Sequence, residues 1–248
     1  MESLFPGKEK LYEGKAKMIF PGDNPGEVYM VFKDSATAFN GVKKGTIEDK
    51  GRLNAEISAI LFNLLEERGI KTHYIEKVDE VTLKVRKLRI LPVEVVVRNI
   101  VAGSLSKRSG REEGTPLPRP VLEIYYKSDE LGDPLWNDEH VLVFGVLTED
   151  ELSEVKEMAR KVSGILREFF AGRGLELVDM KLEFGRIVTS GPAGEEVLGP
   201  IVLGDEISPD TCRFWDKSTG EKLDKDRFRR DLGGVREAYV EVLRRISN

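Results

Sequence analysis

The segment Leu177-Val-Asp-Met-Lys-Leu-Glu-Phe-Gly185 carries the strongest structural signal in the chain. Successive side chains of a strand point to opposite faces, so one face carries Val178, Met180, Leu182 and Phe184. The other face carries Asp179, Lys181 and Glu183, and Leu175 and Leu177 continue it. An apolar back and a partly apolar, charged front predict a strand that packs on a core and lines a cleft. The alternative is a solvated hairpin face, which is common in antiparallel sheets.

A second acidic run, Val202-Leu-Gly-Asp-Glu206, follows this strand, and Ser190-Gly-Pro-Ala-Gly194 between the two has the composition of a turn. Folded as a hairpin, the two runs would bring Asp205 close to Lys181 and Glu183. Carboxylates beside a lysine can bind a hard divalent cation and the phosphates that it carries. The hairpin therefore predicts a site for a metal and a phosphorylated ligand.

Composition limits the class of protein. The chain has 248 residues, of which 40% are apolar, so it can form one large domain or two small ones with a proper core. It contains no apolar run of transmembrane length, and its first residues lack the basic and apolar regions of a signal peptide. The single cysteine, Cys212, excludes an internal disulfide and is typical of a cytoplasmic protein. A net charge of −5 argues against a nucleic-acid partner.

The residue types also limit the kind of metal site. His73 and His140 are the only histidines, and with one cysteine they argue against a structural zinc site or a zinc protease. Any metal here is expected to be bound by oxygen atoms, which favours Mg²⁺. Cys212 has no histidine nearby in the sequence, so we expect a buried small residue rather than a nucleophile.

The pattern of the first half predicts a strand-rich lobe over residues 1–88 and a larger α+β lobe over residues 89–248. Strands are expected over residues 10–13, 17–20, 27–33, 73–78 and 82–88, and a helix over residues 50–68. Leu88–Pro92 is interpreted as the link between the lobes. Because Pro92 cannot donate a ladder hydrogen bond, a strand is expected to begin there rather than pass through it.

The second region is expected to hold the longest helix. Thr148-Glu-Asp-Glu151 is a capping-box pattern, and Gly172 is expected to end the helix. A hairpin over residues 175–207 follows. The last helix is expected to bury Val235, Tyr239, Val242 and Ile246.

Three further motifs suggest phosphate or anion binding. Gly14-Lys-Ala-Lys17 places two lysines on a glycine turn that can lie over phosphates, although a solvated hairpin tip explains it as well. Arg98-Asn-Ile-Val-Ala-Gly-Ser104 offers a guanidinium fork and a loop of N–H groups, with an ion pair between Arg98 and Glu94 as the alternative. Tyr125-Tyr-Lys-Ser-Asp129 is a weak signal by itself.

With these motifs the chain resembles the SAICAR synthetase (phosphoribosylaminoimidazole-succinocarboxamide synthase) family of purine biosynthesis. The resemblance runs from about residue 10 to the C-terminus, and several long motifs in the correct order are more specific than any one of them. The matching segments are Leu11-Tyr-Glu-Gly-Lys-Ala-Lys17, Pro92-Val-Glu-Val-Val-Val-Arg-Asn99, Ala102-Gly-Ser-Leu105, Leu177–Gly185, Leu203-Gly-Asp-Glu-Ile-Ser-Pro-Asp210, Arg213-Phe-Trp-Asp216 and Asp224-Lys-Asp-Arg-Phe-Arg229.

The resemblance implies an ATP-dependent carbon–nitrogen ligase that joins the carboxylate of carboxyaminoimidazole ribonucleotide (CAIR) to the amine of L-aspartate and releases ADP and phosphate. The implied fold is α+β and two-lobed, with antiparallel sheets, flanking helices and ATP in the interlobe cleft, related to the kinase and ATP-grasp arrangement. A homodimer in the cytoplasm is implied, with small-molecule substrates and with neither nucleic acid nor membrane as a partner. A related small-molecule kinase or ligase and a catalytically silent nucleotide-binding protein are the alternatives.

The resemblance also implies roles for individual residues. Lys181 would act among the phosphates and the reacting carboxylate, and Asp179 would support Lys181 or bind the imidazole. Glu183 and Asp205 would hold Mg²⁺. The ATP contacts would be Lys15, Lys17, Lys127 and the segment around Leu88. The substrate contacts would be Arg98, Ser104 and Arg213 on the CAIR phosphate, and Lys225 and Arg229 on substrate carboxylates.

One segment departs from the family pattern. The pattern Asp-x-x-Ser-Ala-x-Asp is replaced here by Asp34-Ser-Ala-Thr-Ala-Phe-Asn40. Thr37 keeps a hydroxyl, but Asn40 stands in place of the acid. If the family's acid orients L-aspartate or a lysine, that role is in doubt in this chain.

Overall fold

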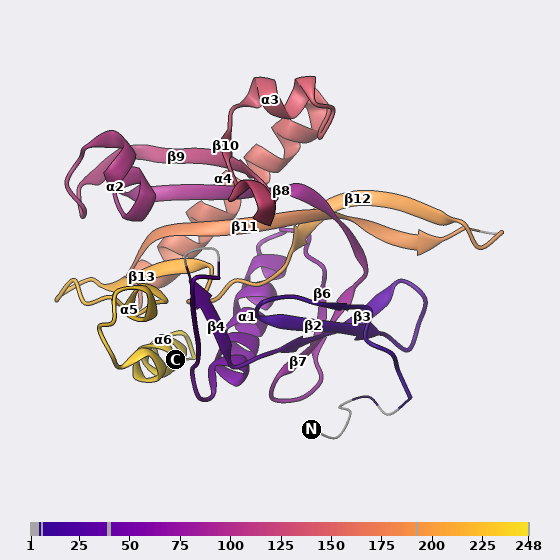
Figure 1. Cartoon of the computed structure of the whole chain (residues 1–248), viewed down its shortest axis with the longest axis horizontal. Helices are drawn as coiled ribbons and strands as arrows, with labels where there is room; N and C mark the ends of the chain where they lie inside the picture. The colour runs from indigo at the N-terminus through magenta and orange to yellow at the C-terminus, as the bar shows by residue number, and fades with distance from the viewer. Residues whose placement is uncertain (1–4, 6, 39–40, 192, 248) are drawn as a thin grey trace.

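The fold is built on two antiparallel sheets, described by a computed structural model for residues 5, 7–38, 41–191 and 193–247 (Figure 1). The first sheet has the strand order β1 (Tyr12–Glu13), β2 (Lys17–Pro21), β3 (Glu27–Phe32), β7 (Thr82–Arg86) and β6 (Tyr74–Lys77). The second has the order β10 (Leu135–Trp136), β9 (Pro116–Tyr126), β8 (Leu88–Ile100), β11 (Leu175–Ser190) and β12 (Glu196–Gly204). Strand β13 (Cys212–Asp216) also pairs with β11, and β4 (Ser35–Ala38) pairs with β5 (Lys43–Thr46).

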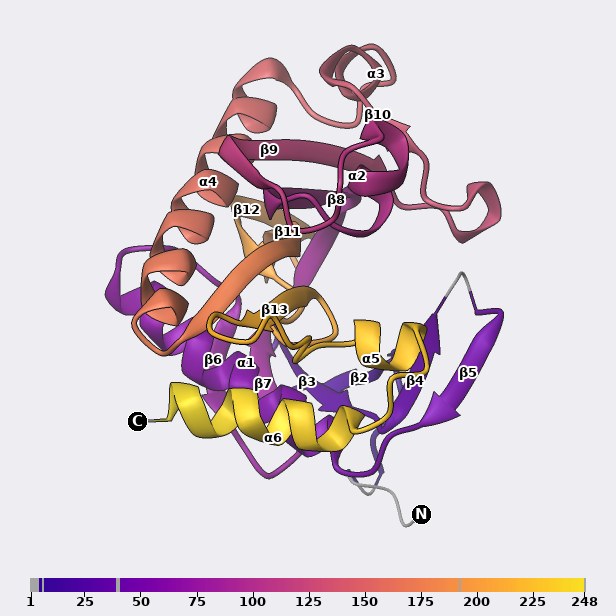
Figure 2. The same ribbon diagram turned by 90° about the vertical axis from the view of Figure 1, so that its left-hand side faces the viewer.

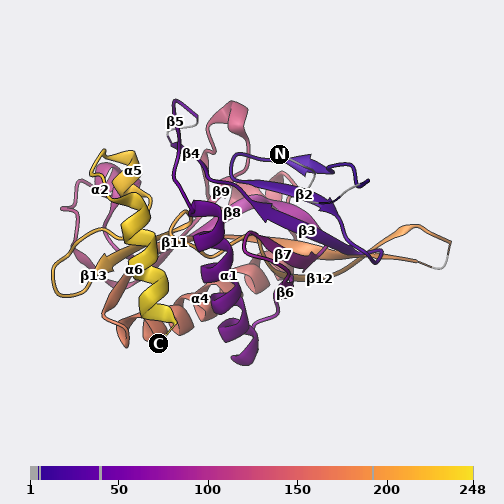
Figure 3. The same ribbon diagram turned by 90° about the horizontal axis from the view of Figure 1, so that it is seen from below.

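The helices cover the sheets. Helix α4 (Glu149–Ala171) packs on the second sheet, and α1 (Lys50–Glu67) packs on the first sheet and on α6 (Val235–Ile246) (Figures 2 and 3). The short helical segments are α2 (Gly103–Ser109), η1 (Asp129–Leu131), α3 (Asp138–Val143) and α5 (Asp226–Arg229). No helix in the described part of the chain is long and apolar enough to cross a membrane.

The helix predictions are confirmed closely. Helix α1 ends one residue before the predicted limit, and Gly69 follows with a φ of 80°. In α4, Thr148 and Glu151 form both hydrogen bonds of the capping box, and Gly172 is the C-cap residue. Helix α6 buries Tyr239, Val242 and Ile246, as its spacing predicts, whereas Val235 is only partly buried. The apolar faces of these helices join both sheets in one core.

Pro92 lies inside a strand, so the prediction that a strand begins there is wrong. Strand β8 runs from Leu88 through Pro92 to Ile100. The pairing of β8 with β11 shifts register between Glu183 and Gly185, opposite this proline, and such irregularities tolerate a residue without an N–H donor. The carbonyl of Pro92 still accepts a hydrogen bond from Lys127 N at 3.0 Å.

The faces of β11 also differ from simple alternation. Leu175 and Leu177 join the main core together with Met180, whereas Val178 packs separately against a small cluster that includes Trp215. The register with β13 shifts between Leu177 and Asp179, and a bulge of this kind exchanges the two faces of a strand. The prediction that Leu175 and Leu177 continue the charged face is therefore wrong.

The predicted hairpin of β11 and β12 is present. Glu183 pairs with Gly204, which places Asp205 beside the charged front of β11. The predicted division into lobes 1–88 and 89–248 stays a prediction. Helix α6, from the second range, packs on α1, from the first.

Candidate active site

A cleft of about 1360 Å³ lies between the two sheets. The first sheet contributes apolar residues such as Met30 and Val85, and the second contributes charged residues such as Glu94 and Lys181. Every residue with a predicted site role lines this cleft: Lys15, Lys17, Leu88, Arg98, Ser104, Lys127, Asp179, Lys181, Glu183, Asp205, Arg213, Lys225 and Arg229. The structure therefore brings together segments that are far apart in the sequence.

Lys181 on β11 lies between two carboxylates. Its Nζ donates to Glu94 Oε1 at 2.9 Å and also to Glu183 Oε1. Burial acts to lower the pKa of Lys181, but the charges of Glu183, Asp205 and Glu94 outweigh it and raise that pKa well above its usual value. The surrounding carboxylates therefore favour the ammonium form of Lys181, which can neutralise negative charge.

Glu183 and Asp205 face the same part of the cleft, and each is paired with a lysine. Glu183 accepts hydrogen bonds from Lys181 and Lys127, and Asp205 accepts one from Lys17. Burial acts to raise the pKa of Asp205, but the charges of Lys17 and Lys181 lower it well below its usual range. The carboxylate of Asp205 is thus held in the ionised form, which can bind a cation.

The donor set suits Mg²⁺ in particular. Mg²⁺ usually binds one or two carboxylates and completes its shell with phosphate oxygens and water. The described residues contain no cluster of three or more Asp, Glu, His or Cys side chains that could hold a metal by themselves. Glu183 and Asp205 fit a Mg²⁺ ion that is shared with phosphates.

Lys17 and Lys15 have different surroundings although both lie in the β1–β2 region. Lys17 Nζ lies 2.9 Å from Glu206 Oε1 as well as bonding to Asp205, and its side chain is 14% exposed. Lys15 is half exposed, and its Nζ lies 2.6 Å from Asp129 Oδ1 in η1. The Lys15–Asp129 ion pair thus joins the two sides of the cleft mouth.

Leu88 occupies the start of β8, where two glycines leave room for it. A Cβ on Gly204 would lie 2.7 Å from Leu88 Cδ1, and a Cβ on Gly185 would lie 2.9 Å from Leu88 Cβ. Both glycines belong to the β11–β12 hairpin. The apolar end of the cleft at Leu88 therefore depends on the hairpin that also carries Glu183.

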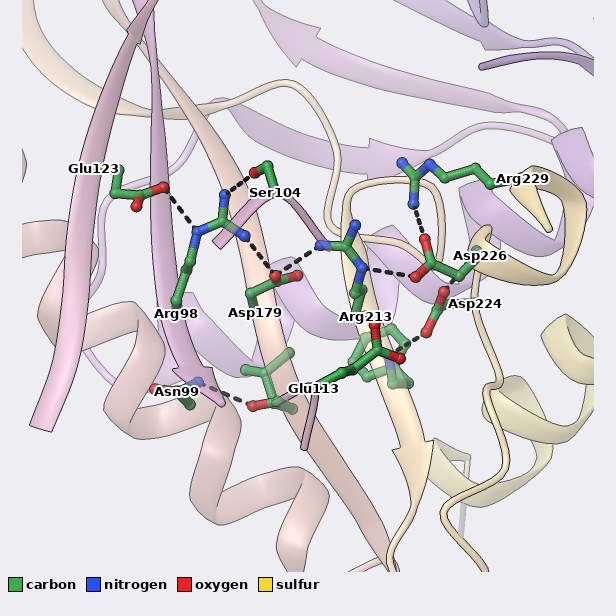
Figure 4. A network of polar contacts seen from close by, with 12 residues as sticks. Arg98, Asn99, Ser104, Glu113, Glu123, Asp179, Arg213, Asp224, Asp226 and Arg229 are labelled. Atoms are coloured by element: carbon green, nitrogen blue, oxygen red, sulfur yellow. Dashed lines mark hydrogen bonds and ion pairs between the residues drawn. The ribbon is translucent and has the colours of Figure 1, made fainter. Parts of the chain in front are cut away.

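At the opposite end, Arg98 is buried, and several hydrogen bonds fix its guanidinium (Figure 4). Its guanidinium donates to Glu123 Oε2 at 2.7 Å, to Asp179 Oδ2 at 2.9 Å and to Ser104 Oγ at 2.9 Å. The alternative that Arg98 pairs with Glu94 is wrong, because the β8–β11 register places Glu94 beside Glu183 and Lys181. Arg98 is fixed by carboxylates from β9 and β11 instead.

The same network continues through Arg213 (Figure 4). Arg213 donates to Asp179 Oδ2 at 2.7 Å and to Asp226 Oδ2 at 3.0 Å, and Arg229 donates to Asp226 Oδ1 at 2.7 Å. Burial acts to lower the pKa of Arg213, but the charges of Asp179 and Asp226 outweigh it and raise that pKa. Three arginines therefore alternate with three carboxylates along one wall of the cleft.

Lys225 lies on the same side of the cleft as Arg229. Burial lowers its pKa, the charge of Asp210 opposes this effect, and its Nζ lies 3.5 Å from Asp210 Oδ2. Asn40 lies outside the described residues, so the departure at that position has no structural account. Cys212 is buried, and burial raises the pKa of its thiol, in agreement with the expectation that it is not a nucleophile.

Sequence reasoning gave no site role to four of the carboxylates that hold these cations, namely Glu94, Glu123, Asp210 and Asp226. It did place Glu206 in the acidic run with Asp205, and Glu206 pairs with Lys17. Asp210 and Asp226 stand within the matched motifs, which is a signal that could have drawn attention to them. Glu94 and Glu123 become recognisable only once the strand register is known.

Comparisons with known proteins agree with this arrangement. The family model for SAICAR synthetase matches residues 10–246. A phosphoribosylaminoimidazole-succinocarboxamide synthase of Clostridium botulinum is 55% identical over 240 residues, which make up 97% of this chain and 98% of that protein. The crystal structure of the synthase from Ehrlichia chaffeensis has a TM-score of 0.90 at 48% identity and covers 96% of this chain and 98% of that one. A SAICAR synthetase in complex with ADP has a TM-score of 0.87 at 52% identity and covers 96% of this chain and 97% of that one.

Proposed function

The chain belongs to the SAICAR synthetase family, and we propose that the charged groups of its cleft form a phosphoryl-transfer end and a substrate-anchoring end. The protein is an ATP-dependent ligase that condenses CAIR with L-aspartate to give SAICAR, ADP and phosphate in purine biosynthesis. The observation that supports the two ends best is on β11: Lys181 faces carboxylates that suit Mg²⁺, and Asp179 faces two arginines.

The chemistry explains why two ends are needed. A carboxylate is a poor acyl donor because its leaving group would be oxide. A CAIR carboxylate oxygen attacks the γ-phosphorus of ATP, ADP leaves, and an acyl phosphate forms. The amine of L-aspartate then attacks the acyl carbon, phosphate leaves, and the nitrogen loses its proton. The first step requires neutralisation of phosphoryl charge more than a protein nucleophile.

ATP is bound at the end formed by the β1–β2 turn, the start of β8 and the loop after β9. Leu88 contributes to the apolar part for the adenine, and Lys15, Lys17 and Lys127 face the phosphates. Lys17 and Lys127 are paired with Asp205 and Glu183. Ammonium groups close to carboxylates keep their charge, which suits contacts with phosphates.

Glu183 and Asp205 would hold Mg²⁺, which would supply neutralisation of the phosphate charge when bound. Lys181 is placed by Glu94 and Glu183 to meet the transferring phosphoryl group and the reacting carboxylate. The carboxylates around Lys181 raise its pKa and favour the ammonium form. Lys181 thus stabilises negative charge in the transition state without taking up or releasing a proton.

CAIR is anchored at the other end through its phosphate, by Arg98, Ser104 and Arg213. Asp179 supports the reaction by holding both arginines from one oxygen. Its contacts with these arginines favour this role over direct support of Lys181. Lys225 and Arg229, which also line the cleft, are assigned to the carboxylates of L-aspartate.

The setting of the enzyme is a separate part of the proposal. We propose a cytoplasmic homodimer with small-molecule substrates, as the resemblance to the SAICAR synthetase family implies. The oligomeric state can be measured by light scattering. A monomeric mass at micromolar concentration would contradict the dimer without affecting the ligase reaction.

An assay with ATP, Mg²⁺, CAIR and L-aspartate, each omitted in turn, tests the function directly. Formation of ADP and SAICAR is expected only when all four are present. ADP formation that continues unchanged without L-aspartate, with no SAICAR, would show a kinase rather than a ligase. Mn²⁺ in place of Mg²⁺ should support turnover if oxygen ligands alone hold the metal.

A further inference from the structure

Helix α1 carries a row of polar side chains on its buried face. Lys50, Asn54 and Ser58 are four residues apart, so they lie one above another on the helix, and each is 0% exposed. A buried lysine is costly unless it is paired. These three residues line up against the segment that follows β12, and none of them lines the cleft.

The row contacts the segment of residues 206–210 directly. Lys50 Nζ lies 2.9 Å from Asp210 Oδ2, and Ser58 Oγ donates to the carbonyl oxygen of Ile207 at 3.2 Å. Asn54 lies between them, and its side chain has no hydrogen-bond partner among the described residues. The segment held in this way begins directly after Asp205.

Asp210 is shared between two lysines. Its Oδ2 lies 2.9 Å from Lys50 Nζ but 3.5 Å from Lys225 Nζ, and its Oδ1 accepts a hydrogen bond from Tyr239 at 2.7 Å. One carboxylate cannot neutralise two ammonium groups. The shorter distance belongs to Lys50, so Lys225, which lines the cleft, is the less closely paired of the two lysines.

We propose that Lys50 is a positioning residue for the ligase reaction: by occupying Asp210, it keeps Lys225 available to a carboxylate of L-aspartate. This inference rests on the proposed role of Lys225. Without Lys50, Asp210 would draw Lys225 into a full ion pair, and the substrate carboxylate would have to compete with Asp210. Lys50 therefore acts on substrate binding from outside the cleft.

The surroundings of Lys225 give this role a distinctive pH signature. Asp210, Arg229, Lys50 and Glu206 are the charged groups that act on it. Burial lowers the pKa of Lys225, and Arg229 and Lys50 lower it further, whereas Asp210 and Glu206 act in the opposite direction. Removal of the charge at Lys50 should therefore raise the pKa of Lys225. The alkaline decline of kcat/KM for L-aspartate should move to higher pH.

The test uses Lys50→Met, Lys225→Met and the double variant. Lys50→Met is expected to raise KM for L-aspartate roughly tenfold, the effect of losing one charged hydrogen bond, and to change KM for ATP less than about twofold. The double variant should be no worse than Lys225→Met, because Lys50 acts through Lys225. Lys77→Met is the matched control, since Lys77 pairs with Glu56 on α1 and does not line the cleft.

Several outcomes would overturn the inference. Lys50 would be only a structural residue if Lys50→Met kept the wild-type KM for L-aspartate, or if its KM for ATP rose in parallel. The same would follow if the increases in KM for L-aspartate of the two single variants multiplied in the double variant. Wild-type kinetics in Lys225→Met would remove the proposed role of Lys225 itself, which is a different failure. If Lys50→Met does not bind ADP as a folded protein, Lys50→Gln provides the same test, because it removes the charge and keeps a donor.

Discussion

Asp179 on β11 holds Arg213 on the neighbouring strand β13 by a hydrogen bond of 2.7 Å from Nη1 to Oδ2. The same oxygen accepts a second hydrogen bond, from Arg98 on β8, at 2.9 Å. One buried oxygen on the central strand therefore sets the distance between guanidinium groups from the strands on either side. Because Asp179 binds both arginines, their guanidinium groups stay close together, and two adjacent guanidinium groups can form an anion site.

Asp179→Asn should weaken CAIR binding and lower stability together. The amide keeps one acceptor but removes the charge between two arginines, so we expect KM for CAIR to rise at least roughly tenfold. Loss of one partner from a buried ion pair should lower the free energy of unfolding by about 3 kcal/mol. Steady-state kinetics and urea unfolding measure the two effects.

The control for this prediction is Glu196→Gln. Glu196 pairs with Lys87 and Arg89 on the surface, where an ion pair is worth about 0–1 kcal/mol. Stability and KM for CAIR should both stay close to the wild type in this variant. If Asp179→Asn and Glu196→Gln lost equal amounts of stability and of CAIR binding, Asp179 would contribute no more than a surface carboxylate.

Glu183→Gln should raise the Mg²⁺ concentration needed for half-maximal activity and lower kcat about a hundredfold. Glu183 is a proposed metal ligand, and it also accepts hydrogen bonds from Lys181 and Lys127. Glu94→Gln is the informative comparison, because Glu94 contacts Lys181 and is not a proposed metal ligand. It should lower kcat without changing the Mg²⁺ requirement. Wild-type turnover and metal dependence in Glu183→Gln would remove Glu183 from the metal site.

The sequence predicts which residues face the cleft better than it predicts their partners. Alternation along β11 and the following turn are local signals, and they are enough to bring Lys181, Glu183 and Asp205 together. The contact between Lys181 and Glu94 depends on the register of β8 with β11, two strands that no short turn connects. Local sequence patterns do not fix such a register.

Long-range polar contacts are predicted least well. Lys50 and Asp210 are 160 positions apart, and Lys50 opens a helix whose apolar spacing predicts only part of its buried face, since Lys50, Asn54 and Ser58 are buried as well. Nothing in the local pattern distinguishes this lysine from a solvated one. The same holds for Val178, whose face is changed by a bulge at the start of β11. Propensity and periodicity predict elements, but buried ion pairs depend on how the elements pack.

Asp224 and Asp226 should give opposite contributions to the pH dependence of stability. Burial acts to raise the pKa of Asp226, but the charges of Arg213 and Arg229 lower it to about 2. Its stabilising effect is therefore present above its unfolded pKa and is lost as pH falls through about 2. Burial and the charge of Asp226 raise the pKa of Asp224 to about 7. Its contribution is complete below its unfolded pKa and is lost as pH rises through about 7.

Two variants separate these contributions in urea unfolding across the pH range. Asp226→Asn should lose roughly 2 kcal/mol relative to the wild type above about pH 4, and the difference should shrink towards about pH 2. Asp224→Asn loses one acceptor for backbone N–H groups at every pH. Its disadvantage should narrow as pH rises past about 7, because the wild type alone must then ionise a buried acid. If the free energy of unfolding varied with pH in the same way in the wild type and in both variants, the pKa shifts of Asp224 and Asp226 would be contradicted.

Lys15 and Lys17 should respond differently to the same substitution, although both are proposed to bind ATP phosphates. Lys15 is half exposed and pairs with Asp129, so Lys15→Met should raise KM for ATP and change stability by less than about 1 kcal/mol. Lys17 neutralises Asp205 and Glu206, so Lys17→Met should raise KM for ATP and also lower stability by about 3–5 kcal/mol. Asp129→Asn breaks the ion pair with Lys15 and keeps the lysine. If Lys15 binds the ATP phosphates, KM for ATP in this variant should stay within about twofold of the wild-type value. A rise in KM for ATP in Asp129→Asn as large as in Lys15→Met would instead assign Lys15 to closing the cleft mouth.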